Sequence, residues 1–106
     1  MSENWVVLCK TDEVAAGEAK AFTIDDKRLC AVNDGESYFV LDDLCTHGQA
    51  FLSEGYCDIE ECVLECPLHG GLVNYRDGSA AGDPVEKPTR SYAVRIDGND
   101  VLVSLG

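Results

Sequence analysis

Short runs of apolar and β-branched residues, separated by turn sequences, dominate this chain and limit the folds open to it. Such runs occur at residues 5–9, 21–24, 29–32, 38–41, 62–64, 72–75, 92–96 and 101–105. The turns include Asn33-Asp34-Gly35, Arg76-Asp77-Gly78 and Asp97-Gly98-Asn99, whose residues tolerate the positive φ of tight hairpins. No stretch keeps a sustained 3.6-residue apolar period, and residues 11–16 could form one helical turn at most. The pattern predicts an all-β chain folded as a small antiparallel sandwich or barrel.

The length of 106 residues fits one domain, which we expect to span residues 1–106. Segment 80–89 contains Pro84 and Pro88, so we expect a surface loop there and not a central strand. The longest apolar run, residues 5–9, is far too short to cross a bilayer. The first four residues lack the basic and apolar layout of a signal peptide. We therefore expect a cytoplasmic protein without a membrane partner.

The charge is strongly negative and unevenly distributed. Twenty Asp and Glu against eight Lys and Arg give a net charge of −12, which repels nucleic acids and anionic lipids. We therefore expect no nucleic-acid partner. Between Arg28 and Arg76 there is no Lys or Arg, while the acidic residues there are Asp34, Glu36, Asp42, Asp43, Glu54, Asp58, Glu60, Glu61 and Glu65. This stretch is either a solvated face that keeps the protein soluble or a field that guides it to a basic protein.

Six cysteines occur in the chain, and a reducing cytoplasm would keep them as thiols. Cys9 and Cys30 lie inside apolar runs, so we expect both to be small buried hydrophobic residues. Cys45, Cys57, Cys62 and Cys66 remain for chemistry.

Each of the two histidines lies close to one of these remaining cysteines. His47 comes two residues after Cys45, and His69 comes three residues after Cys66. Thiolate and imidazole groups are ligands for zinc and for iron–sulfur centres. A tetrahedral zinc ion could use all four residues, and so could a two-iron cluster that takes one ligand for each iron from each pair. A four-cysteine plant-type cluster needs C-x₄-C-x₂-C, which the spacing of the cysteines at 57, 62 and 66 misses by one residue.

The two pairs lie in segments that resemble the ligand boxes of the Rieske iron–sulfur proteins. These segments read Cys45-Thr46-His47-Gly48-Gln49-Ala50-Phe51-Leu52-Ser53-Glu54-Gly55 and Glu65-Cys66-Pro67-Leu68-His69-Gly70-Gly71. The likeness covers nearly the whole chain and is strongest to the small ferredoxins of bacterial aromatic-ring-hydroxylating dioxygenases. It implies one [2Fe–2S] cluster, with Cys45 and Cys66 on one iron and His47 and His69 on the other. It also implies a Rieske-like sandwich with a two-loop cluster-binding subdomain at about residues 43–72. Cys57 and Cys62 match no ligand of the family, so we expect them to be buried or half-buried free thiols.

The resemblance further implies a function in electron transfer. It suggests a one-electron carrier, not itself an enzyme, between a flavoprotein reductase and the terminal oxygenase of an aromatic-ring-hydroxylating dioxygenase. A free electron shuttle works best as a monomer, so we expect a monomer. No G-x-G-x-x-G or Walker sequence is present, which agrees with a shuttle that lacks a nucleotide site. The alternatives are a ferredoxin of an aromatic monooxygenase, another Rieske accessory subunit, and a structural module that binds zinc through the same four residues.

Overall fold

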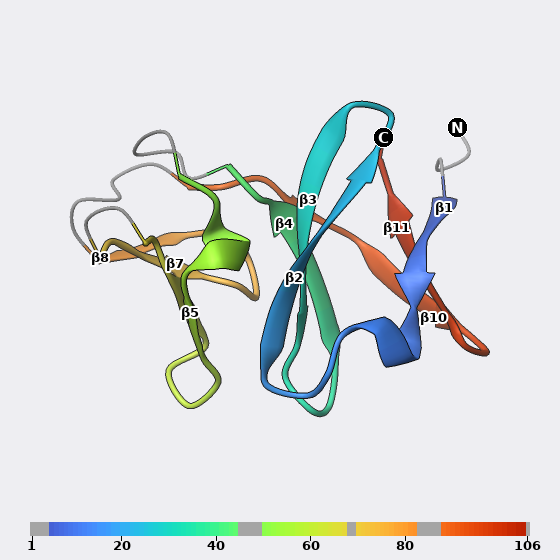
Figure 1. The fold of residues 1–106 in the computed structure, drawn as a ribbon, viewed down its shortest axis with the longest axis horizontal. Helices are drawn as coiled ribbons and strands as arrows, with labels where there is room; N and C mark the ends of the chain where they lie inside the picture. The colour runs from blue at the N-terminus through green and yellow to red at the C-terminus, as the bar shows by residue number, and fades with distance from the viewer. Residues whose placement is uncertain (1–4, 45–49, 68–69, 83–87, 106) are drawn as a thin grey trace.

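The computed structural model describes residues 5–44, 50–67, 70–82 and 88–105. These residues form three antiparallel sheets (Figure 1), which confirms the all-β antiparallel fold that the sequence predicted. The strands are β1 (Trp5–Lys10), β2 (Glu18–Ile24), β3 (Lys27–Asn33), β4 (Tyr38–Asp42), β5 (Tyr56–Asp58), β6 (Val63–Glu65), β7 (Leu72–Asn74), β8 (Ala80–Gly82), β9 (Ser91–Tyr92), β10 (Val94–Asp97) and β11 (Asp100–Ser104). Two 3₁₀ turns complete the described elements: η1 (Thr11–Glu13) and η2 (Leu52–Glu54). Neither turn has the length or the apolar character needed to cross a membrane.

Two of the sheets build the body of the molecule. One has the strand order β1-β11-β10 and the other the order β2-β3-β4-β9. Between them lies a core of buried residues: Leu8, Cys9, Val14, Leu29, Ala31, Val40, Tyr92, Val101 and Val103. The phenol of Tyr92 donates a hydrogen bond to the Asp42 carboxylate, which ties β9 to β4. The body is therefore a small sandwich.

The third sheet, β5-β6-β7-β8, packs on the other face of the β2-β3-β4-β9 sheet, which is therefore the central sheet of the molecule. The buried residues between these two sheets form a second core. Strand β3 sends Leu29 and Ala31 into the body core and Cys30 and Val32 into the second core. Because both faces of β3 are covered, all four residues are buried, and the strand reads as a continuous apolar run. The expected burial of Cys9 and Cys30 is confirmed, with 5% and 0% of their surfaces exposed.

Along the chain, the third sheet and its loops come between two strands that are neighbours in the central sheet. Strands β4 and β9 pair directly, with Val40 opposite Tyr92. The Asp42 N–H donates to the Arg90 carbonyl oxygen at 2.9 Å, so the chain leaves and re-enters the sheet at the same place. The described residues between 43 and 90 thus form an insertion on one side of the body (Figure 1).

Two expectations for the strands were wrong. The apolar run 92–96 is not one strand, because β9 pairs with β4 and β10 pairs with β11, so the chain changes sheets at Ala93. Segment 80–89 is not a loop from its start, because Ala80–Gly82 forms the edge strand β8 against β7. An edge position suits a segment that leads toward a proline. Pro84 lies outside the described residues.

Candidate metal centre

The first predicted ligand segment is closed at its base by backbone contacts. Leu44 and Phe51 form an isolated antiparallel bridge. One residue further out on each side, the Leu52 N–H donates to the Asp43 carbonyl oxygen at 2.7 Å. Residues 45–49 lie between these contacts, and Cys45 and His47 are therefore outside the described residues. Their segment begins and ends at one fixed point of the fold.

A buried carboxylate holds this base together. Asp43 is fully buried, although the acidic stretch had been expected to form a solvated or guiding face. Its carboxylate accepts hydrogen bonds from Arg28 Nε at 2.7 Å, from the Ser53 N–H at 2.7 Å and from Ser53 Oγ at 2.8 Å. The Arg28 guanidinium also stacks on the Phe51 ring, 3.8 Å from its centroid. Asp43 is thus a structural residue that joins β3 to both ends of the first ligand segment.

The second predicted ligand segment follows β6, and its described ends are joined by backbone hydrogen bonds. The Cys66 N–H donates to the Gly71 carbonyl oxygen at 2.7 Å, and the Gly70 N–H donates to the Cys66 carbonyl oxygen at 3.0 Å. Gly70 has a φ of +74°, which a side chain would strain. Cys66 has only 1% of its surface exposed and packs in the same core as Ala50 and Leu64. His69 lies outside the described residues.

A close backbone approach joins the two ligand segments. A Cβ atom on Gly55, just after the first segment, would overlap the Glu65 carbonyl oxygen and would lie 3.1 Å from Pro67 Cδ. Only a glycine allows the chain to pass this close to the start of the second segment. The approach fixes the base of one segment against the other.

Cys57 and Cys62 lie near the two ligand segments but do not belong to either. Cys57 and Cys62 are half-buried free thiols, as expected, and pack against the second core. Burial raises the pKa of the Cys57 thiol. Cys62 and Cys66 lie at opposite ends of strand β6, about 13 Å apart at the usual rise of a strand. That separation is too large for two ligands of one iron–sulfur cluster, so the cysteines at 57, 62 and 66 do not form a plant-type site.

The described residues fit a cluster held by the two segments. Cys66 is a buried thiol at the start of the second segment, whose described ends are joined by backbone hydrogen bonds, and the chain just after the first segment lies against it at Gly55. Within the described part of the chain, no group of three His, Cys, Asp or Glu residues could hold a metal ion. Cys45, His47 and His69, three of the four predicted ligands, belong to the segments outside it.

Comparisons with known proteins define the class. A profile of the Rieske [2Fe-2S] domain matches residues 4–93, and this chain belongs to that family. Its cofactor is one Rieske-type [2Fe–2S] cluster.

Particular relatives narrow the class further. The chain is 38% identical over 103 residues to the anthranilate 1,2-dioxygenase ferredoxin subunit of Burkholderia cepacia, covering 97% of this chain and 94% of the relative. The solved ferredoxin of carbazole 1,9a-dioxygenase from Nocardioides aromaticivorans IC177 is 34% identical, with a TM-score of 0.90 over 93% of this chain and 95% of that chain. A chain from a complex of reduced oxygenase and oxidised ferredoxin in carbazole 1,9a-dioxygenase is 30% identical, with a TM-score of 0.86 over 97% of this chain and 94% of that chain.

Proposed function

We propose that this protein is the one-electron carrier of an aromatic-ring-hydroxylating dioxygenase system. It would accept electrons from a flavoprotein reductase and deliver them to the terminal oxygenase. The observation that carries the proposal is the pairing of a Cys-x-His and a Cys-x-x-His segment on two loops whose bases are fixed side by side. The ferredoxin subunits of aromatic dioxygenases among its relatives support the same function.

We assign the ligands as Cys45 and Cys66 on one iron and His47 and His69 on the other. When bound, the cluster supplies a one-electron couple. The protein must then hold the bases of the two loops at fixed positions relative to each other. The Asp43 hydrogen bonds and the close approach of the backbone at Gly55 support this role. Leu44 precedes the first ligand and is 53% exposed, so an apolar side chain lies beside the loops, where a partner could dock.

We also propose that residues 1–106 form one domain, with the cluster-binding loops at about residues 43–72. The shared use of β3 by both cores supports this organisation. The protein is expected to act as a cytoplasmic monomer that transfers electrons without catalysing a reaction on an organic substrate. The five described cysteines are unpaired, which agrees with a reducing compartment.

Low-temperature EPR before and after dithionite, with iron and zinc assays on the same sample, tests the cofactor. We expect two irons per chain and a signal that appears only on reduction. Single Cys45→Ser, His47→Ala, Cys66→Ser and His69→Ala variants should each lose that signal, while Cys57→Ser should keep it. Stoichiometric zinc without a signal in an anaerobic preparation would instead show a structural zinc module.

Reconstitution with candidate reductases and oxygenases tests the role. We expect substrate hydroxylation that requires the reductase, this protein and the oxygenase together. Electron transfer to an aromatic monooxygenase and not to a dioxygenase would show that the protein is the ferredoxin of a monooxygenase system. A reducible cluster that supports neither enzyme would contradict both.

A further inference from the structure

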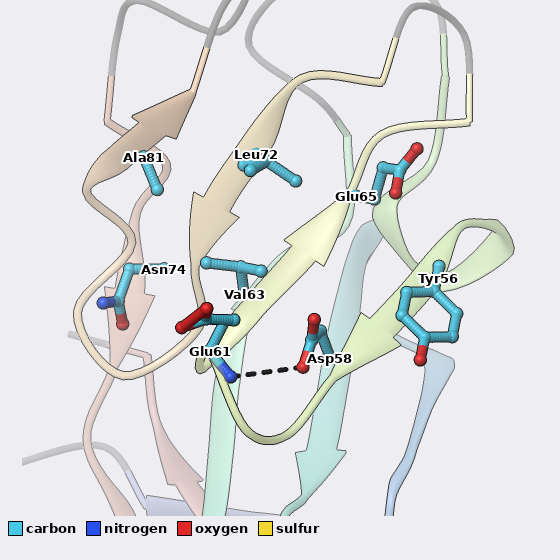
Figure 2. Close-up of a pocket in the computed structure, with 8 residues that line it drawn as sticks. All are labelled: Tyr56, Asp58, Glu61, Val63, Glu65, Leu72, Asn74 and Ala81. Carbon is cyan, nitrogen blue, oxygen red and sulfur yellow. Dashed lines mark hydrogen bonds between the residues drawn. The ribbon is translucent and has the colours of Figure 1, made fainter.

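A groove of about 480 Å³ crosses the outer face of the β5-β6-β7-β8 sheet, on the side away from the second core (Figure 2). Along β6 and β7 the side chains alternate: Leu64 and Val73 point into the core and are fully buried. Their neighbours Val63 and Leu72 line the groove, together with Ala81 of β8. The groove therefore has a largely apolar floor on the face of the sheet that points away from the second core.

The rim of the groove is acidic. Asp58, Glu61 and Glu65 line it, and the first two are linked by a hydrogen bond from the Glu61 N–H to Asp58 Oδ1 at 3.1 Å. None of these three carboxylates pairs with a cation among the described residues. The sequence offers no Lys or Arg between Arg28 and Arg76. An apolar floor inside an acidic rim that no described cation neutralises is complementary to a basic protein surface with a protruding apolar side chain.

The position of the groove connects it to the ligand loop. Glu65 directly precedes Cys66, and Leu72 directly follows Gly71, so one end of the groove adjoins the loop that begins at Cys66. The other end reaches Asp58 and Glu61 at the β5–β6 turn (Figure 2). A protein that docks over the ligand loops could reach down this face without any rearrangement of the sheet.

We infer that this groove is a docking surface for a basic redox partner, which places a Lys- or Arg-bearing segment against the acidic rim and an apolar side chain against Val63 and Leu72. The inference rests on the proposed function and adds a second contact region to the loop end. The rim raises the rate of encounter, and the apolar floor holds the partner once it is bound.

Three variants of the holoprotein test this surface. Asp58→Asn/Glu61→Gln removes two rim charges while keeping an oxygen at position 58 for the Glu61 N–H. Asp12→Asn/Asp97→Asn removes the same charge from exposed positions in η1 and β10, at the opposite end of the molecule (Figure 1). Ala81→Gln fills the groove without changing the charge. Unchanged EPR signals and thermal midpoints would show that all three keep the fold and the cluster.

The measurement is the second-order rate constant for electron transfer, by stopped flow, with the reductase and with the oxygenase that reconstitute hydroxylation. At low ionic strength we expect Asp58→Asn/Glu61→Gln to slow transfer with at least one of them by about 5-fold, and the distant pair by less than about 2-fold. At about 0.5 M salt the rim effect should shrink, whereas Ala81→Gln should remain slow, because a steric block is not screened.

Equal rates for the groove variants and the distant pair with both enzymes would overturn the inference and leave the proposed function intact. Failure of the wild-type holoprotein to transfer electrons to any candidate would overturn the proposed function, and the docking surface with it.

Discussion

The hydrogen bonds of Asp43 predict a large effect from a single conservative substitution, Asp43→Asn. An asparagine can keep the bond from the Ser53 N–H, but its amide nitrogen would then face Arg28 Nε, donor against donor. A hydrogen bond to a charged group contributes about 1.5–3 kcal/mol. The Arg28 side chain is 40% exposed and can be rehydrated, so the lower part of that range applies and we expect a loss of about 2 kcal/mol.

The assay is the thermal midpoint of the holoprotein at one fixed scan rate, followed by far-UV circular dichroism and by the visible absorbance of the cluster. A loss of about 2 kcal/mol should lower the midpoint by about 8 °C in a chain of this size. Absorbance should bleach at the same lowered temperature, because Asp43 closes the segment that contains Cys45 and His47.

Two further variants control this experiment. Ser53→Ala keeps the backbone donor and loses only the Oγ bond, so we expect a loss of about 1 kcal/mol. Asp34→Asn makes the same charge change where one oxygen, which asparagine retains, accepts both the Glu36 and the Ser37 N–H. Equal midpoints for Asp43→Asn and Asp34→Asn would refute the structural role of the buried carboxylate.

Three other predictions concern packing and titration. Gly55→Ala should abolish soluble holoprotein, because the new Cβ would overlap the Glu65 carbonyl oxygen. The control Gly98→Ala changes a glycine with a φ of +61° in open space and should lower the free energy of unfolding by only about 1 kcal/mol. Similar yields and thermal midpoints for the two variants would contradict the close approach at Gly55. Burial raises the pKa of Tyr92 to about 12, so its contribution to stability is complete below about pH 10 and is lost as the pH rises toward 12. The thermal midpoint of Tyr92→Phe should decline less than that of wild type over this range, and parallel declines would count against the raised pKa. Burial raises the pKa of Cys9 to about 11 and also raises the pKa of Cys30. Peptide mass mapping after iodoacetamide treatment at pH 8 should therefore find both thiols unmodified unless urea is added. Labelling of either thiol in the native protein would show that it is accessible.

The sequence was most informative where a local rule decides the structure. Asn33-Asp34-Gly35 and Asp97-Gly98-Asn99 form the predicted turns, with Gly35 and Gly98 at positive φ. The β2–β3 turn was not predicted, because Asp25 and Asp26 adopt positive φ without a glycine to mark the position. Strands β5 and β8 were also missed: each has only three residues, and Ala80–Gly82 lacks the branched and aromatic residues that mark a strand.

The site shows the same division between local and long-range information. The spacing of cysteine and histidine was visible in the chain and led to the family. The role of Asp43 was not visible, since it stands beside Asp42 in an acidic stretch and only the folded chain brings Arg28 and Ser53 to it. Gly55 likewise reads as an ordinary turn glycine until β6 is seen to pass against it.

The insertion of residues 43–90 between two paired strands has a consequence for how such carriers diversify. Its two ends meet at the hydrogen bond between Asp42 and Arg90, so the pairing of β4 with β9 keeps the ends close, and the insertion must in addition cover Cys30, Val32 and Leu41 on the central sheet. The cost of closing a longer or shorter segment there grows only slowly with its length. Those parts of the insertion that do not pack on the central sheet can therefore change in length or sequence while the paired strands of the body stay the same.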